Sequence, residues 1–191
     1  AALAAKAQRR LNVRLVKGAY WDSEIKLAQQ HGLADYPVFT RKQNTDISYQ
    51  ACARALLEAK WIYPQFATHN AYTLACILEM AGEQRDFEFQ RLHGMGEAMY
   101  DPLVTGNKLH CRIYAPVGKY ADLLPYLVRR LLENGANTSF VNLVQNKQLN
   151  LASLLADPVD AILVLSDKRN PHIVLPEAIY GSERNNAEGL D

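Results

Sequence analysis

The feature that most constrains the fold is a strand-then-helix pattern that occurs four times in succession. Short runs of β-branched and apolar residues predict strands, and each run is followed by stretches whose apolar residues recur at helical spacing. Consecutive units of this kind predict parallel strands joined by right-handed crossovers. The expected strands cover residues 12–17, 63–68, 87–92 and 111–114, and the expected helices cover about 22–31, 45–60, 71–81, 97–103 and 120–134.

Glycine and polar residues directly follow each expected strand, in the loops 18–21, 68–70, 93–96 and 114–118. A (β/α)8 barrel presents such loops on its catalytic face, and an open doubly wound sheet also binds ligands at the carboxyl ends of its strands. The barrel is preferred because these loops follow every strand, with no single switch point. Four units are half of a barrel. We therefore predict an α/β fold that forms the C-terminal half of a distorted (β/α)8 barrel.

The first ten residues contain many strong helix formers but no N-cap signal. They are typical of the end of a helix whose beginning lies elsewhere, so we expect the sequence to be a piece of a longer protein. The end of the sequence, from residue 167, is rich in proline, glycine and polar residues and is expected to form a linker or a frayed tail.

The composition is that of a soluble globular domain, with 49% hydrophobic and 21% charged residues in 191. A formal net charge of +1 gives no electrostatic reason to expect nucleic acid as a partner of this segment. The three cysteines, Cys52, Cys76 and Cys111, are far apart and fit neither a disulfide framework nor a zinc site. A reducing cytosol fits this pattern best, and no metal is predicted.

The helix expected at 120–134 combines a broad leucine stripe with a polar face that holds Tyr126, Arg129, Arg130 and Glu133. Two adjacent guanidinium groups can hold a carboxylate or a phosphate, because each offers a planar fork of donors. A solvated helix face is the alternative for this stretch. In the same way His69 alone fits a structural histidine, and Tyr20 and Trp21 fit core aromatics.

Five stretches taken together resemble the flavin-dependent proline dehydrogenase domain of the bifunctional proline utilization A proteins. They cover residues 14–22, 65–70, 89–96, 112–118 and 126–134 and occur in the family's order. Single-function proline dehydrogenases are the near alternative. The resemblance divides the chain into a half barrel at 1–145, and short helices with a linker at 146–191 that leads towards an aldehyde dehydrogenase domain.

The resemblance implies that L-proline is oxidised to Δ1-pyrroline-5-carboxylate by FAD, with the electrons passed to a quinone. It places Arg14 near the flavin N5, and the arginine pair at the substrate carboxylate. The implied catalytic residues are Arg14, Tyr20 and Tyr114; the implied substrate contacts are Leu92, Tyr126, Arg129 and Arg130; and the implied cofactor contacts are Arg14, Val16, Gly18, Ala19, Trp21, Lys42, Thr68, His69, Asn70 and Glu133.

For the full-length protein the resemblance implies a bacterial cytoplasmic location, peripheral membrane association and a homo-oligomer. The family also uses a lysine and an aspartate from earlier barrel strands, and this sequence has no region that supplies them. We therefore expect the isolated chain to be inactive and to bind FAD weakly. Two alternatives stay open: a non-catalytic barrel fragment with a scaffold or interaction role, and a phosphate-binding barrel enzyme of another chemistry.

Overall fold

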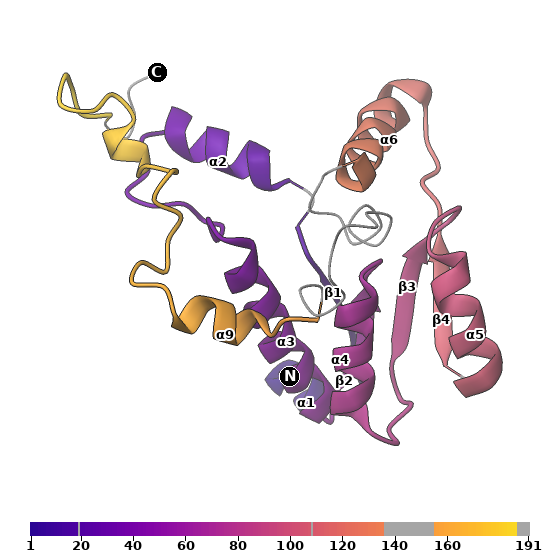
Figure 1. Cartoon of the computed structure of the whole chain (residues 1–191). Coiled ribbons are helices and arrows are strands. Elements are labelled where there is room, and N and C mark those ends of the chain that lie inside the picture. The colour runs from indigo at the N-terminus through magenta and orange to yellow at the C-terminus, as the bar shows by residue number, and fades with distance from the viewer. Residues whose placement is uncertain (19, 108, 136–154, 187–191) are drawn as a thin grey trace. The chain divides into compact units, whose positions relative to one another are not determined.

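The computed structural model describes residues 1–18, 20–107, 109–135 and 155–186 (Figure 1). The elements follow one another in the order α1 (Ala2–Ala7), β1 (Leu11–Val16), α2 (Trp21–Gln30), α3 (Lys42–Glu58), β2 (Ile62–Ala67), α4 (Ala71–Ala81), β3 (Glu88–Leu92), α5 (Glu97–Asn107), β4 (His110–Tyr114), α6 (Tyr120–Gly135), α9 (Pro158–Leu163) and the 3₁₀ helix η1 (Pro176–Ala178).

The four strands form one sheet in the order β1-β2-β3-β4, and each neighbouring pair is parallel. The predicted α/β class with parallel strands in sequence order is thereby confirmed. Helix α3 begins at Lys42, earlier than the expected caps at 45 and 46, and α5 continues past Pro102 to Asn107. The boundaries of the strands agree with the sequence pattern to within one or two residues.

One face of the sheet packs against the helices and forms the main hydrophobic core. Phe66 of β2 and Phe89 of β3 have no exposed surface, and they meet Ile77 of α4 and Tyr100 of α5 in the same cluster. The two phenylalanine rings lie 6.2 Å apart between centroids. Full burial of side chains of this size contributes about 1.5–3 kcal/mol each, so this face fixes helices and strands together.

The opposite face of the sheet carries polar side chains. Side chains alternate between the two faces along each strand, and the register shows which of them lie next to one another. Glu88 of β3 pairs in register with Gln65 of β2, and Gln90 pairs with Arg112 of β4. The Glu88 carboxylate accepts hydrogen bonds from Gln65 at 2.9 Å, from Gln90 at 2.7 Å and from both Nε and Nη2 of Arg112 at 2.7 and 2.8 Å. A buried carboxylate needs this many donors to stay charged.

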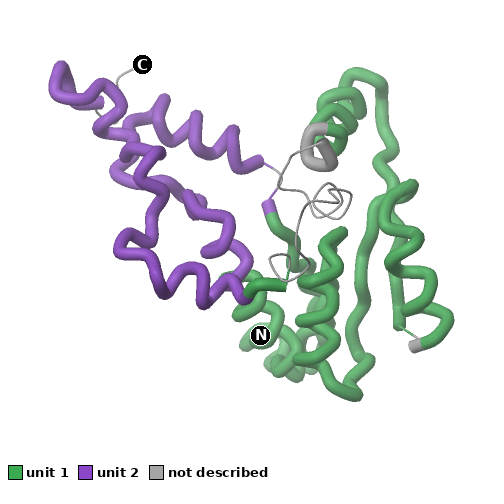
Figure 2. The backbone as a smooth tube through the Cα atoms, in the orientation of Figure 1, with its two compact units in different colours: residues 1–17, 48–156 green, residues 18–47, 157–191 purple. Residues whose placement is uncertain are grey.

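The chain divides into two compact units, each of which is described by itself (Figure 2). The first consists of residues 1–17 with 48–156 and contains the sheet. The second consists of residues 18–47 with 157–191 and has its own small core, in which Ile25, Ala28 and Tyr36 pack with Leu33, Val38 and Ile173. The predicted division at residue 145 into a half barrel and a linker stays a prediction.

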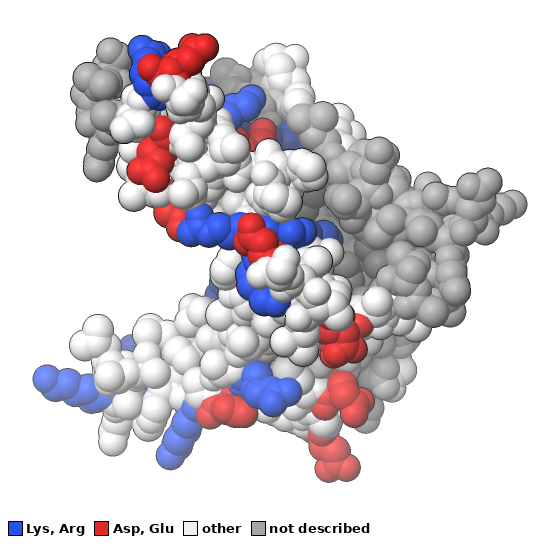
Figure 3. Space-filling model, turned by 60° about the vertical axis from the view of Figure 1, so that its left-hand side comes forward, with Lys and Arg blue, Asp and Glu red and all other residues white. Residues whose placement is uncertain are grey.

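The surface carries both signs of charge. Figure 3 shows lysine and arginine side chains interspersed with aspartate and glutamate on the face drawn there, in keeping with the net charge of +1. No helix in the described ranges is both long and apolar enough to cross a membrane.

Candidate active site

The first unit brings several of the predicted site residues to the carboxyl ends of its strands. Val16 is the last residue of β1, Thr68 follows β2, and Leu92 and Tyr114 end β3 and β4. Leu92 and Tyr114 pair in register, so both project from the polar face of the sheet. Because the strands are parallel and adjacent, these ends line one edge, which is where α/β enzymes bind their substrates.

Arg14 and Tyr114 contact each other across the polar face. The guanidinium carbon of Arg14 lies 4.6 Å from the centroid of the Tyr114 ring, although β1 and β4 are not neighbouring strands. A cation over an aromatic ring contributes about 0.5–2 kcal/mol, depending on its exposure to water. This contact fixes a positive charge near the carboxyl ends of the strands.

His69 joins the loop after β2 to the end of β3. The backbone N–H of Leu92 donates to Nε2 of His69 at 3.1 Å. Since a backbone amide can only donate, Nε2 must hold a lone pair, and the ring proton of the neutral imidazole sits on Nδ1. Burial lowers the pKa of His69, and the positive charges of Arg130 and Arg91 lower it further. His69 is therefore held neutral at pH 7.

The loop from Thr68 to Asn70 is fixed by hydrogen bonds to α4 and α5. Asn70 caps α4, because its Oδ1 accepts from the backbone N–H of Thr73 at 3.0 Å. The Thr68 hydroxyl accepts from the Asn70 N–H at 3.1 Å, and the Thr68 carbonyl accepts from the Tyr100 hydroxyl at 2.8 Å. The start of α4, which carries the positive end of the helix dipole, therefore lies beside the edge of the sheet.

Helix α6 supplies Tyr126, Arg129 and Arg130, and all three side chains are half-buried. The guanidinium carbon of Arg130 lies 5.2 Å from the centroid of the Tyr126 ring. The positive charge of Arg130 is one of the causes that lower the pKa of His69. The expectation of a fully solvated polar face does not hold for these side chains.

The leucine stripe of α6 is largely exposed in this chain. Leu124, Leu127, Val128 and Leu131 are 43%, 45%, 43% and 69% exposed. The predicted helix is confirmed over Tyr120–Gly135, but these four apolar side chains are not buried in the core of this chain.

The predicted residues of the second unit are described within that unit alone. Tyr20 precedes α2 as its N-cap residue and Trp21 begins the helix, and their side chains are 48% and 42% exposed, so neither is a core aromatic. The indole N–H of Trp21 donates to the Phe39 carbonyl at 2.8 Å. Lys42 pairs with Asp46 at 2.6 Å, and a side chain at Gly18 would contact nothing within 4 Å.

Two predicted residues cannot be placed. Ala19 lies outside the described residues, and Glu133 falls in α6 with its side chain outside them. Sequence reasoning in turn missed a supporting residue, Gly96. Its φ is +72°, and a Cβ there would lie 3.2 Å from Cδ2 of His69 and 3.4 Å from the Tyr100 ring. Gly96 ends the expected loop 93–96, and from the sequence alone a glycine there predicts only a turn.

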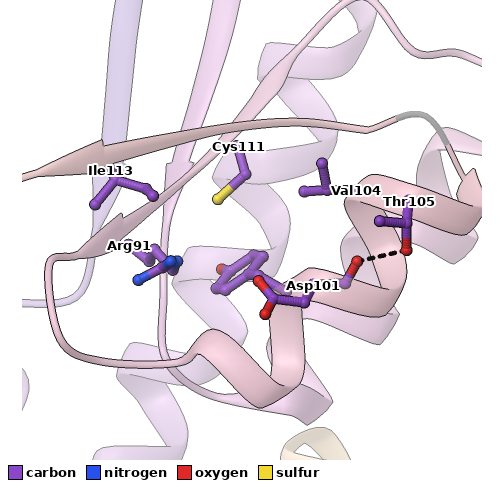
Figure 4. Close-up of a pocket in the computed structure, with 7 residues that line it drawn as sticks. Arg91, Asp101, Val104, Thr105, Cys111 and Ile113 are labelled. Carbon is purple, nitrogen blue, oxygen red and sulfur yellow. Dashed lines mark hydrogen bonds between the residues drawn. The ribbon is translucent and has the colours of Figure 1, made fainter.

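A pocket of about 300 Å³ lies between β4 and α5, on the other face of the sheet from Tyr114. In Figure 4 the side chains of Arg91 and Cys111 point towards it, and the Thr105 hydroxyl donates to the Asp101 carbonyl at its rim. Tyr100 also lines it. Burial raises the pKa of the Cys111 thiol, which makes it a poor nucleophile. This pocket contains none of the predicted site residues, so the strand ends stay the candidate active site.

Among the described residues, no group of three or more His, Cys, Asp or Glu could hold a metal ion.

Comparison with known proteins identifies the family of the chain. A family model described as proline dehydrogenase matches residues 1–143. The chain belongs to the proline dehydrogenase family. It is 56% identical, over 99% of its length, to the bifunctional protein PutA of Klebsiella aerogenes, of which it spans 16%. It is 34% identical to the mitochondrial proline dehydrogenase 2 of Arabidopsis thaliana, over 69% of the chain and 30% of that protein.

Solved structures agree with this membership in the proline dehydrogenase family. Proline utilization A from Bradyrhizobium japonicum matches 99% of the chain with a TM-score of 0.91 and 54% identity, and the match covers 20% of that protein. The resemblance predicted from the five sequence stretches is thereby confirmed. The chain spans less than a fifth of the length of the bifunctional relatives it matches.

Proposed function

We propose that this chain forms part of the active site of an enzyme that oxidises L-proline to Δ1-pyrroline-5-carboxylate with FAD. The family membership, and the similarity to both bifunctional and plant proline dehydrogenases, support the choice of proline. The bifunctional relatives support a larger protein that carries a second activity.

The observation that carries the proposal is the arginine pair of α6: both side chains are half-buried, and the Arg130 guanidinium lies over the Tyr126 ring. L-proline has a single carboxylate, and two guanidinium groups can hold both of its oxygens in a fixed orientation. Holding a small substrate in one orientation lowers the entropic part of the barrier. Tyr126, which lies beside Arg130, is suited to contact the apolar part of the ring.

The residues at the strand ends suit a flavin dinucleotide: Arg14 is a fixed cation beside Tyr114, and the start of α4 suits a negative group. The residues that would hold FAD are Arg14, Val16, Gly18, Ala19, Trp21, Lys42, Thr68, His69, Asn70 and Glu133. When bound, FAD supplies an acceptor for the hydride of the proline ring carbon beside nitrogen.

The protein's own part is then binding and electrostatics. Arg129 and Arg130 hold the carboxylate, while Leu92, Tyr114, Tyr126 and Tyr20 enclose the ring and exclude water. Arg14 places a positive charge where negative charge develops on reduction. A neutral His69, with its proton on Nδ1, offers a donor at the same edge of the sheet.

Several further statements concern the full-length protein. We propose a quinone as the electron acceptor, peripheral membrane association, a cytoplasmic location and a homo-oligomer. Each follows from the family resemblance and is independent of the geometry of the sheet.

Flavin uptake and substrate competition test the proposal in the full-length protein. We expect the purified protein to bind FAD and to reduce an artificial dye when L-proline is added, and we expect tetrahydrofuroate, a carboxylate of similar shape, to compete. Competition by phosphate esters instead would favour a phosphate-binding enzyme. A colourless protein that ignores both FAD and proline would favour a scaffold role.

A further inference from the structure

We propose that residues 165–186 form a positioning element that fastens loop 31–41 and thereby sets the places of Trp21 and Lys42 for FAD. The proposal rests on the function proposed above, because these two residues are its cofactor contacts. All the residues that carry it belong to the second compact unit.

Loop 31–41 contains neither helix nor strand, and the N–H groups of its first three residues donate to carbonyls of α2. Beyond these residues, partners come from a segment more than a hundred residues away in the sequence. The Tyr36 hydroxyl donates to the Val174 carbonyl at 2.7 Å, and it also accepts from Gln29 at 2.9 Å. Tyr36 is 9% exposed and packs with Ile173, which adds an apolar contact between the two segments.

Three further contacts lie where the loop meets α3. The Thr40 hydroxyl accepts from the Asn170 N–H at 3.0 Å, and Nε of Arg41 donates to the Arg169 carbonyl at 2.7 Å. In the first turn of the helix, Nδ2 of Asn44 donates to the Lys168 carbonyl at 2.9 Å.

Two more contacts extend the fastening along the loop. Arg169 pairs with Asp35, and Nδ2 of Asn186 donates to the Gln29 carbonyl at 2.5 Å and to the Pro176 carbonyl at 3.0 Å. A hydrogen bond from the Tyr36 N–H and the pairing with Arg169 lower the pKa of Asp35, so this carboxylate is charged at neutral pH.

These contacts lie next to residues that adjoin Trp21 and Lys42, the two proposed cofactor residues. Phe39 accepts the indole N–H of Trp21 at 2.8 Å, and it directly precedes Thr40. Lys42 directly follows Arg41. Since Thr40 and Arg41 are both bound to residues 169–170, a shift of the distant segment would move the Phe39 carbonyl and the start of α3 together. The segment therefore sets the positions of the residues on both sides of Thr40 and Arg41.

The segment lies outside the part of the chain that the family model matches. The proline dehydrogenase model ends at residue 143, before the segment begins. The bifunctional relatives match 99% of the chain, whereas the plant proline dehydrogenases match 65–69% of it. The segment thus lies outside the residues that the family model matches and within the 99% of the chain that the bifunctional relatives match.

The test compares two double variants of the full-length protein. Tyr36→Phe with Thr40→Val removes two hydroxyls that contact the segment and keeps the shapes of both side chains. Tyr180→Phe with Thr105→Val is the matched control, because Tyr180 is 42% exposed and Thr105 bonds only within α5. None of these four residues is placed in the substrate or cofactor site.

Three measurements are made: the Kd for FAD from titration of the apoprotein, kcat and KM for proline at saturating FAD, and hydrogen exchange of the loop amides. For the first variant we expect the Kd for FAD to rise about tenfold, because each lost hydrogen bond contributes about 1 kcal/mol and only part of that loss reaches the cofactor. The kcat and the KM for proline should stay within twofold, and amides 33–41 should exchange faster. The control should match the wild type in all three.

A Kd for FAD equal to that of the control would overturn the proposal, even if the loop amides exchange faster. Unchanged exchange would overturn the fastening itself, and it is measured without FAD. A wild-type protein that takes up no FAD would contradict the proposed function and with it the cofactor role of the segment. If the double variant does not fold, Asn44→Ala provides a milder test, with an expected rise in the Kd for FAD of about threefold.

Discussion

Replacing Glu88 by glutamine should weaken the polar face of the sheet by a measurable amount. The change keeps the size of the side chain and removes its charge. In the structure Glu88 is 4% exposed, and Arg112 donates to both of its oxygens. The amide of the new side chain would place an N–H₂ group against Nη2 of Arg112, so one of these two contacts becomes donor against donor.

The magnitude follows from the burial of the two partners. Loss of one member of a buried ion pair costs about 3–5 kcal/mol, while a hydrogen bond to a charged group contributes about 1.5–3 kcal/mol. The Arg112 side chain is 61% exposed, so water can hydrate its guanidinium after the change. We therefore expect the lower range, about 2–3 kcal/mol for the local opening of β3 and β4.

Hydrogen exchange of the β3 and β4 amides in the full-length protein measures this free energy locally. A double-mutant cycle with Arg112→Met isolates the pair, and we expect a coupling of about 1.5 kcal/mol or more. The hydrogen bond from Arg112 is the largest cause that lowers the pKa of Glu88 below its usual 4.5. The stabilisation is therefore present above pH 4.5 and is lost as the pH falls through the lowered pKa. A coupling near zero at pH 7 would refute the reasoning.

Three other predictions follow from the site. Arg129→Met and Arg130→Met should each raise the KM for proline strongly with FAD content intact, since losing one partner of a desolvated charge pair costs about 2–5 kcal/mol; an unchanged KM in both would remove the carboxylate role. Gly96→Ala should lower the melting temperature, because its φ of +72° and its contact with His69 strain a side chain, whereas Gly106→Ala in α5 should not. His69 has a lowered pKa, so it contributes stability that is full above its unfolded value of 6.5 and falls below it, by at most about 1.4 kcal/mol per pH unit. His69→Gln should lack this pH dependence, and an identical profile in both proteins would contradict the neutral assignment.

The order of the strands, and the edge at which the candidate site residues of the sheet gather, could be predicted from the sequence. Both rest on local signals: the alternation of residues such as Val13 and Leu15, and the polar residues that follow each strand. The side of the sheet on which Arg14, Leu92 and Tyr114 lie follows from the same pattern, because side chains alternate between the two faces of a strand.

Contacts between distant parts of the chain could not be predicted in this way. Asp35 and Arg169 are separated by 134 positions, and neither residue carries a local signal for the other. The hydrogen bond from the Leu92 amide to His69 could not be predicted either, because no sequence pattern indicates which backbone N–H donates to a side chain. The leucine stripe of α6 shows the reverse case: periodicity reveals an apolar face, but not the surface that the face contacts.

The most direct test of the central claim is anaerobic addition of L-proline to the full-length protein with FAD bound, followed through the visible absorbance of the flavin. The account predicts that L-proline bleaches the wild-type flavin. It also predicts that the Arg130→Met protein, with the same FAD content, needs a much higher proline concentration for the same bleaching. An FAD-loaded wild type whose absorbance does not change with L-proline would contradict the proposed function.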